Sequence, residues 1–191
     1  MDFKKLEAYE LLRCQNGTKN EIRWPNGRLK FRRIGGLSDF YFDDGKKAAD
    51  LELIGSSALL GPTYALTTWY KNGERQLQAT GYQGQMPTWY NLFRKDGTRH
   101  TFVSKHLERH WDVHGNTIVC RAFVNGEWNN LLALAKQVNP NSSQQTLNKV
   151  INELIYTMRG NSMLPPYESE YEYKARKKYM MKLYMETKKS R

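Results

Sequence analysis

The stretch GPTYALTTWYKNG, residues 61–73, is followed shortly by a second of similar design, GQMPTWYNLFRKDG, residues 84–97. Each begins with a glycine, passes through a short strand-like segment with a Trp-Tyr pair, and ends on an Asx-Gly dipeptide. Asx-Gly can supply the positive φ angles at the centre of a type I′ turn, and runs rich in Trp, Tyr and Thr favour strands. The two stretches therefore predict tight antiparallel hairpins.

Asx-Gly dipeptides also occur on either side of these two stretches, at Asn26-Gly27, Asp44-Gly45 and Asn125-Gly126. Between these turn signals we predict strands near residues 21–24, 28–34, 39–43, 63–71, 75–82, 88–95 and 98–103. Gly73 and Gly97 lie 24 residues apart, and Gly27 and Gly73 lie 46 apart. This spacing indicates a decayed hairpin repeat of about two dozen residues.

The repeat resembles the MORN-like repeats of the YwqK family, whose units read aromatic-x-Asn-Gly followed by a strand and a return turn that contains glycine. The resemblance covers residues 24–97, and the unit around Asp44-Gly45 departs from it because that unit lacks the Trp-Tyr pair. The resemblance implies an antiparallel meander without catalytic machinery that serves as an interaction surface. An ordinary meander whose turns need Asx-Gly explains the same residues.

Helical periodicity replaces the strand pattern near both ends of the chain. Residues 2–14 and 129–138 each predict a short helix. A further helix, capped by Ser142 or Ser143, follows from apolar residues at helical spacing over 147–158. A last helix is expected over residues 167–189, where acidic residues come first and basic residues last.

We therefore predict an α+β fold. It consists of an antiparallel β-hairpin meander over residues 21–103, helices over 128–160 packed at its C-terminal side, and a long terminal helix. Residues 1–160 form the expected core, and residues 167–191 form a basic C-terminal helix or tail. A chain of 191 residues fits one domain with such an appendage.

The composition narrows the function classes. A formal net charge of +11 favours polyanionic partners. Cys14 and Cys120 are too few for a disulfide framework or a zinc cage, so we expect packing residues in a reducing, intracellular compartment or inside a particle assembled there. The charged N-terminus predicts no classical secretion signal, and no uncharged apolar stretch is long enough to predict a membrane span.

The histidines lie close together in the sequence, at His100, His106, His110 and His114. On a helix beginning at Ser104, His106 and His110 would share a face, as metal ligands spaced i, i+4 do. Lysine and arginine residues interleave the histidines, no cysteine pair accompanies them, and HLERH is not the H-E-x-x-H motif. We predict no metal site, which leaves open a solvated polar helix or a phosphate-contacting stretch.

No catalytic template is present in the sequence. The chain contains no glycine-rich nucleotide-binding loop and no G-x-S-x-G nucleophile elbow. We therefore predict no catalytic residues, no cofactor and a protein that is not an enzyme.

Basic side chains near the first Asx-Gly form one candidate binding surface, which comprises Arg23, Arg28, Lys30 and Arg32. Strand alternation would direct Arg28, Lys30 and Arg32 to one face, where they would neutralise phosphates near Trp24. The solvated outer face of a half-buried sheet explains the same pattern.

A second candidate surface lies in KARKKYMMKLYMETKKSR, residues 174–191. Its basic members are Lys174, Arg176, Lys177, Lys178 and Lys182. Its apolar members, which we expect to dock into a partner groove, are Tyr179, Met180, Leu183 and Tyr184. A helix packed on the chain's own sheet is the alternative.

Together these patterns favour a non-enzymatic interaction or assembly protein with a protein partner, such as a structural component of a large nucleoprotein or virus-like particle. The alternative is a nucleic-acid-binding regulatory protein that uses the basic strand face. A histidine-metal nuclease is the third hypothesis.

Overall fold

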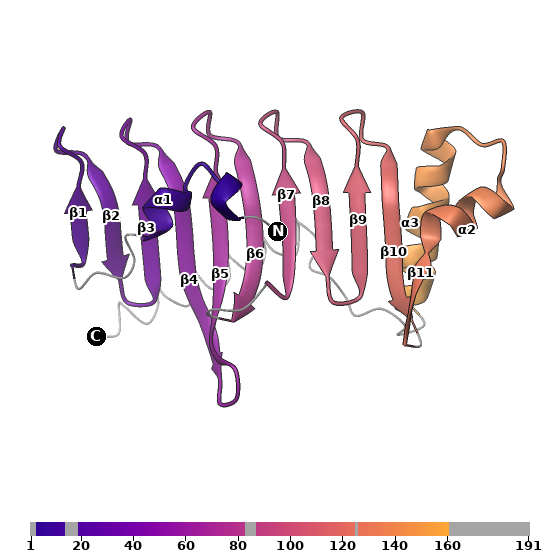
Figure 1. Cartoon of the computed structure of the whole chain (residues 1–191), viewed down its shortest axis with the longest axis horizontal. Coiled ribbons are helices and arrows are strands. Elements are labelled where there is room, and N and C mark those ends of the chain that lie inside the picture. Colours follow the sequence, from indigo (N-terminus) through magenta and orange to yellow (C-terminus); the bar gives the residue numbers. More distant parts are fainter. Residues whose placement is uncertain (1–2, 14–18, 83–86, 125, 161–191) are drawn as a thin grey trace, which may run out of the picture.

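A computed structural model describes residues 3–13, 19–82, 87–124 and 126–160. Eleven antiparallel strands form one sheet in which every strand pairs with the next strand along the chain (Figure 1). The predicted hairpin meander is therefore present, but the predicted α+β class is wrong. Within the described residues the fold is mostly β, and helices occur only before the first strand and after the last.

The strands are β1 Glu21–Arg23, β2 Leu29–Ile34, β3 Leu37–Tyr41, β4 Lys47–Ser57, β5 Gly61–Trp69, β6 Arg75–Tyr82, β7 Trp89–Phe93, β8 Arg99–Ser104, β9 Leu107–Trp111, β10 Thr117–Val124 and β11 Glu127–Asn130. The helices are η1 Phe3–Lys5, α1 Tyr9–Leu12, α2 Leu131–Val138 and α3 Gln144–Gly160. The predicted helix over 167–191 lies outside the described residues.

The meander continues well past residue 103, where the sequence predicted its end. The HLERH stretch, predicted to be helical, is the β8–β9 turn followed by β9. Strand β9 pairs with β8 on one side and β10 on the other, and this pairing outweighs the local i, i+4 spacing of the histidines. The long strand β4 was also missed, because its Ala, Asp, Glu and Gly residues are depleted in strands.

The two helices after the sheet confirm their predictions. Asn130 caps α2 by accepting a hydrogen bond from the Ala133 amide, and α3 covers the predicted apolar run. The predicted helix over residues 2–14 is instead divided into η1 and α1. Its path is interrupted because the Glu7 amide donates to the Gln76 side chain of β6 rather than to a helical carbonyl.

Five hairpin turns line one edge of the sheet, which we call the turn edge. Their glycines all have positive φ and are Gly27, Gly45, Gly73, Gly97 and Gly115. In the third turn the Gly73 amide donates to the Tyr70 carbonyl, and the Tyr70 amide donates to the Glu74 carbonyl. The predicted type I′ turns are therefore wrong, because Asx and Gly occupy the second and third positions of a three-residue hairpin loop.

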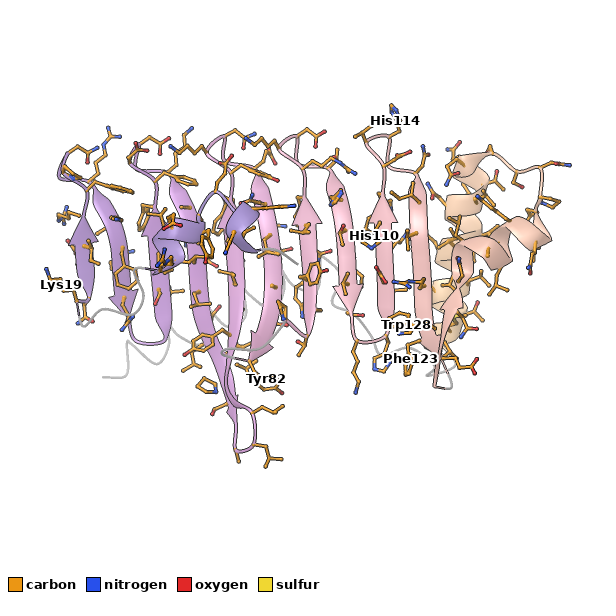
Figure 2. The ribbon with its side chains drawn as sticks, viewed as in Figure 1. Lys19, Tyr82, His110, His114, Phe123 and Trp128 are labelled. Atoms are coloured by element: carbon orange, nitrogen blue, oxygen red, sulfur yellow. The ribbon has the colours of Figure 1, made fainter. Side chains whose placement is uncertain are left out.

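The opposite edge of the sheet carries the remaining connections. Figure 2 places His114 on the turn edge and Tyr82, Phe123 and Trp128 near the opposite edge. The β4–β5 hairpin extends beyond the other connections on this side (Figure 1). The two edges therefore differ in shape as well as in sequence.

The N-terminal helices and α3 cover opposite faces of the sheet. Phe31, Phe40 and Ala49 are opposite one another on β2–β4 and pack with Ala8 and Leu11. The residue paired with Ala49 on β5, its partner on β6, and so on across the sheet extend this row of side chains to Thr101 on β8. The adjacent Phe102 must therefore point to the other face, because successive strand side chains alternate.

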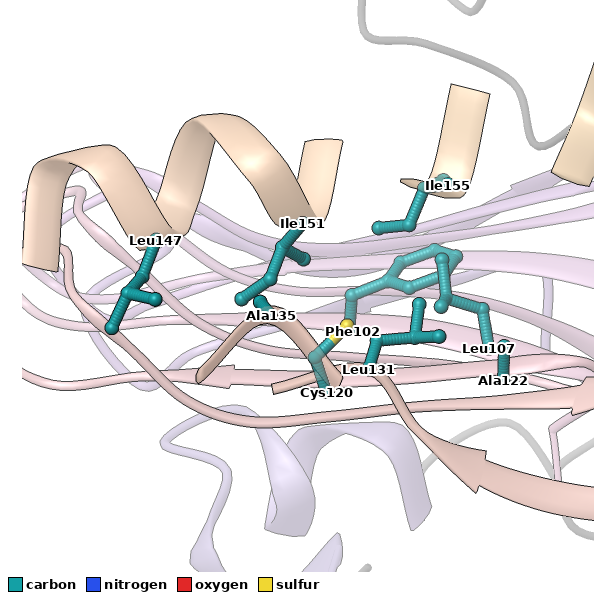
Figure 3. Close-up of a cluster of buried hydrophobic side chains, with 9 residues drawn as sticks. All are labelled: Phe102, Leu107, Cys120, Ala122, Leu131, Ala135, Leu147, Ile151 and Ile155. Atoms are coloured by element: carbon teal, nitrogen blue, oxygen red, sulfur yellow. The ribbon is translucent and has the colours of Figure 1, made fainter. Parts of the chain in front are cut away.

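Phe102 belongs to a second core, beneath α3 (Figure 3). Its nine buried members are Phe102, Leu107, Cys120, Ala122, Leu131, Ala135, Leu147, Ile151 and Ile155. Cys120 is thus a packing residue, as predicted, and burial raises the pKa of its thiol to about 11. The position of Cys14 lies outside the described residues.

Candidate binding surfaces

A row of alternating aromatic and cationic side chains crosses the sheet near the turn edge, on the face opposite α1. We call it the ladder, and its members are Tyr41, Lys47, Trp69, Arg75, Phe93, Arg99 and Trp111. In the β3–β4, β5–β6 and β7–β8 hairpins an aromatic residue lies opposite a cation on the paired strand, as Trp69 lies opposite Arg75, whereas Trp111 lies opposite Thr117. The repeat of the hairpin thus builds the row.

Each cation of the ladder also lies over the aromatic ring of the following hairpin. Lys47 Nζ is 5.5 Å from the Trp69 ring centroid, and the Arg99 guanidinium is 5.5 Å from the Trp111 ring centroid. Such contacts are worth about 0.5 to 1 kcal/mol each at exposed sites. The ladder is therefore stabilising even where no helix covers it.

Carboxylates neutralise one end of the ladder. Lys47 Nζ lies 2.8 Å from Asp39 Oδ1 and 3.2 Å from Asp50 Oδ2, and both aspartates are buried. Burial alone would lower the pKa of Lys47, but these two carboxylates outweigh it and raise the pKa. Among the described residues, Arg99 has no carboxylate within ion-pair distance. The positive charge of Arg99, at the β8 end of the ladder, is therefore not neutralised by a described carboxylate.

The basic residues singled out near the first turn do not form one row. The Arg28 guanidinium donates to the Asp44 carbonyl at 2.6 Å, Lys30 Nζ lies 4.5 Å from the Trp24 ring centroid, and Arg32 pairs with Asp39 at 3.2 Å. Arg23 pairs with Glu21. A register shift at Ile22 and Arg23 disturbs the expected alternation. The four cations are thus engaged separately by local partners.

The predicted docking set Tyr179, Met180, Leu183 and Tyr184 lies outside the described residues. The same holds for the basic set Lys174, Arg176, Lys177, Lys178 and Lys182. Both remain predictions.

The structure brings only two of the four histidines together. His100 Nδ1 and His110 Nδ1 each lie 3.0 Å from Thr101 Oγ1, and His110 Nε2 lies 2.7 Å from Glu108 Oε1. His106 lies instead near the Phe123 ring, and His114 is in the fifth turn. No group of three or more His, Cys, Asp or Glu side chains within the described parts of the chain has the geometry to hold a metal.

The polar groups of this histidine cluster interact with one another and with neighbouring arginines. Burial, Arg94 and His110 lower the pKa of His100. Burial raises the pKa of Glu108, but hydrogen bonds from His110 and Arg121 outweigh it and hold that pKa below its ordinary value. The Thr101 side chain is buried, so a substrate has no direct approach to its hydroxyl.

Large apolar side chains are exposed at the edge opposite the turns. We call this set the apolar edge patch, and its members are Ile34, Leu37, Leu53, Ile54, Leu59 and Leu60. Leu59 is 94% exposed and Ile34 is 54% exposed. The β2–β3 turn packs directly on β4, since a Cβ on Gly36 would lie 3.1 Å from Leu53 Cβ. By strand alternation Ile34 and Leu37 lie on one face of the sheet and Leu53 on the other, so the patch surrounds this edge from the β2–β3 turn to the β4–β5 hairpin.

The sequence contained a signal for this patch that the hairpin pattern obscured. Residues 53–70 form an uninterrupted run of eighteen residues without a charged side chain, in a chain of net charge +11. Only its second half was predicted as a strand. A search for long uncharged segments bounded by charged residues, here Glu52 and Lys71, would have identified it.

Comparisons with known proteins add little to these surfaces. No protein-family model matches the chain, and no curated protein matches it. Two crystal structures of TarM show a weak likeness, one of them an S. aureus TarM mutant in complex with fondaparinux, alpha-GlcNAc-glycerol and UDP. Identity is 15% over 70% of this chain in both, with TM-scores of 0.35 and 0.34.

The chain spans about a quarter of TarM, 26% of its length. A likeness at these TM-scores carries no argument about function. Within the residues described, no helix is long and apolar enough to cross a membrane.

Proposed function

We propose that the protein is a non-enzymatic assembly protein that docks onto a partner through the apolar edge patch. The observation that carries this proposal is the exposure of Leu59, Leu60 and Ile54 on a hairpin that projects beyond the sheet. Removal of apolar surface from water contributes about 25 cal/mol per square ångström toward association, against which the lost freedom of the two partners counts. Contiguous exposed apolar patches are typical of interaction sites.

The polar clusters support docking over catalysis. Asp39, Asp50 and Glu108 are each paired with cations, and the hydroxyl between the two histidines belongs to a buried side chain. These groups stabilise the sheet surface through contacts with one another. A component of a large nucleoprotein or a virus-like particle is the kind of assembly that we propose.

The proposal is tested by aspartate substitutions on opposite edges of the sheet. The double variant Leu59→Asp with Leu60→Asp adds carboxylates to the apolar edge patch, whereas Val113→Asp adds one at the fifth turn, where Val113 is 65% exposed. Extracts of the native source are fractionated on a density gradient. We expect the wild-type chain and Val113→Asp to sediment in a complex heavier than the 22.4 kDa monomer. The double variant should sediment as the monomer.

Identical sedimentation of the wild-type chain and the double variant would contradict the proposed docking surface. A thermal melt of both variants checks that they remain folded. Because all three substituted side chains are substantially exposed, we expect their melting temperatures to stay close to the wild-type value.

A second candidate function is binding of nucleic acid on the ladder face, which the charge of Arg99 favours. Phosphate contacts by the ladder would make the affinity for single-stranded nucleic acid fall as the salt concentration rises. In a plot of log affinity against log salt concentration, each contact adds about 0.7 to the magnitude of the slope. We expect Arg99→Ala to flatten this slope, and Arg32→Ala to change it less because Asp39 already neutralises Arg32. Equal slopes in all three proteins would exclude the ladder as the contact.

A further inference from the structure

The projecting part of the β4–β5 hairpin has an unpaired backbone edge. Strand β3 pairs with β4 only as far as Leu37 opposite Glu52, with one further bond from the Leu53 amide to Gly36. Beyond a register shift at Ile54, no described strand pairs with the outer side of Gly55–Ser57. An unpaired strand edge is a template for pairing with another chain.

The other side of the same hairpin is less suited to such pairing. Strand β6 begins to pair with β5 at Thr63 opposite Tyr82. The next residue toward the tip is Pro62, which has no amide hydrogen to donate to an added strand. Only the β4 side of the hairpin therefore offers a continuous open edge.

We propose that this edge pairs with the same edge of a second copy of the chain. The β4 segment of one copy would lie antiparallel to that of the other, across a twofold axis at Ser56. Two identical strands are self-complementary in this arrangement, and with the β5 side blocked the assembly closes as a dimer rather than growing as a fibre. The inference rests on the proposed function, because it names the partner of the apolar edge patch.

The charge distribution favours this contact over others between two copies. Each copy has a net charge of +11, so most approaches bring like charges together. The hairpin avoids this repulsion, because residues 53–70 carry no charged side chain. Pairing along β4 would also bring exposed Ile54 and Leu59 of the two copies close to each other. Apolar burial then adds to the backbone hydrogen bonds.

Sedimentation velocity of the purified full-length chain at micromolar concentrations tests the proposal. We expect a wild-type dimer. Ser56→Lys places two like charges near the axis and should raise the dissociation constant about tenfold or more. Val138→Lys adds the same charge at a 75% exposed position on α2 and should leave the dimer intact. A monomeric wild-type chain, or a dimer insensitive to Ser56→Lys, would overturn the inference.

Disulfide formation tests the twofold arrangement itself. In a Cys14→Ser background, single cysteines are introduced by Ile54→Cys, Ser56→Cys and, as the control, Val138→Cys. Opposed Cα atoms in an antiparallel pair are about 4.5 to 5.5 Å apart, within the range for a disulfide. A single cysteine lies opposite its own copy only where the twofold axis passes, so mild oxidation should give covalent dimers of Ser56→Cys and none of Ile54→Cys or Val138→Cys. Absence of Ser56→Cys dimers would refute pairing across an axis at Ser56.

These results separate the inference from the function on which it rests. If the purified chain is monomeric but Leu59→Asp with Leu60→Asp still removes it from a heavier complex in extracts, the patch binds a different protein. The self-pairing inference then fails and the proposed function stands. If neither assay depends on the hairpin, both fail.

Discussion

The turn edge and the opposite edge, which carries the apolar edge patch, connect the same set of strands. They are nevertheless built in different ways. At the turn edge, neighbouring turns are bonded to one another. The Asn72 side chain donates to the Lys95 carbonyl at 2.6 Å, and the Asn26 side chain donates to the Asp43 carbonyl at 3.0 Å. The projecting β4–β5 hairpin instead exposes apolar side chains and an unpaired strand.

This difference shows that loops at the turn edge are constrained by their neighbours, whereas the β4–β5 hairpin can vary independently. At the turn edge, side chains of the first two turns reach the next turn, so that a change in one loop affects its neighbour. The β4–β5 hairpin can lengthen without disturbing the pairing of the remaining strands. We expect substitutions at the turn edge to alter stability and substitutions at the apolar edge to alter association.

The largest expected contrast is between Phe42→Ala and Leu59→Ala. Phe42 opens the second turn, is 3% exposed and packs in the core under α1. Its loss should lower the free energy of unfolding by about 3 to 5 kcal/mol. Leu59→Ala should change it by less than about 0.5 kcal/mol, since that side chain is already in water. Urea denaturation measures both, and similar losses would remove the distinction between the edges.

A smaller contrast compares two glycines with open space around them. Gly73 has a φ of 95°, whereas Gly55 on the projecting hairpin does not have a positive φ in the left-handed range. Gly73→Ala should cost about 1 to 2 kcal/mol, because a Cβ is strained in that conformation. Gly55→Ala should be neutral or stabilise the monomer by up to about 1 kcal/mol. Thermal or urea unfolding of the two variants under monomeric conditions tests this order.

The smallest expected effect is a dependence on pH that arises at the turn edge. Hydrogen bonds from the Thr98 side chain and amide hold the pKa of Asp96 below its ordinary value of 3.8. The Asn116 side chain, with backbone amides, lowers the pKa of Asp112 despite some burial. A lowered folded-state pKa means that the stabilisation is present above the ordinary pKa and is lost as pH falls through the lowered value.

NMR titration should therefore place the midpoint of the Asp96 carboxyl below 3.8. Asp96→Asn should reduce the acid-induced fall in melting temperature. An Asp96 midpoint at or above the ordinary value would contradict the hydrogen-bonded turn. Residues 53–62 contain no carboxylate and should contribute nothing to this dependence.

Local sequence signals predicted the parts of this fold whose stability is local. Asx-Gly located four of the five turns at the turn edge, because a glycine with positive φ is needed wherever the loop closes. The fifth turn was missed because His114 replaces the Asx residue, and Asp112 accepts the His114 and Asn116 amide hydrogen bonds instead. The apolar spacing of α3 likewise predicted a helix that the structure confirms.

By itself the sequence determined the positions of four turns at the turn edge, the helices α2 and α3, and the uncharged run of residues 53–70, because each depends on residues close together in the chain. Only the tertiary structure decided that β4 and β9 are strands, since their stability comes from pairing with neighbours on both sides. The ladder likewise required the register of successive hairpins, which sets Lys47 over Trp69. The apolar edge patch appeared only when the sheet brought the β2–β3 turn against β4 and left the hairpin between β4 and β5 projecting into solvent.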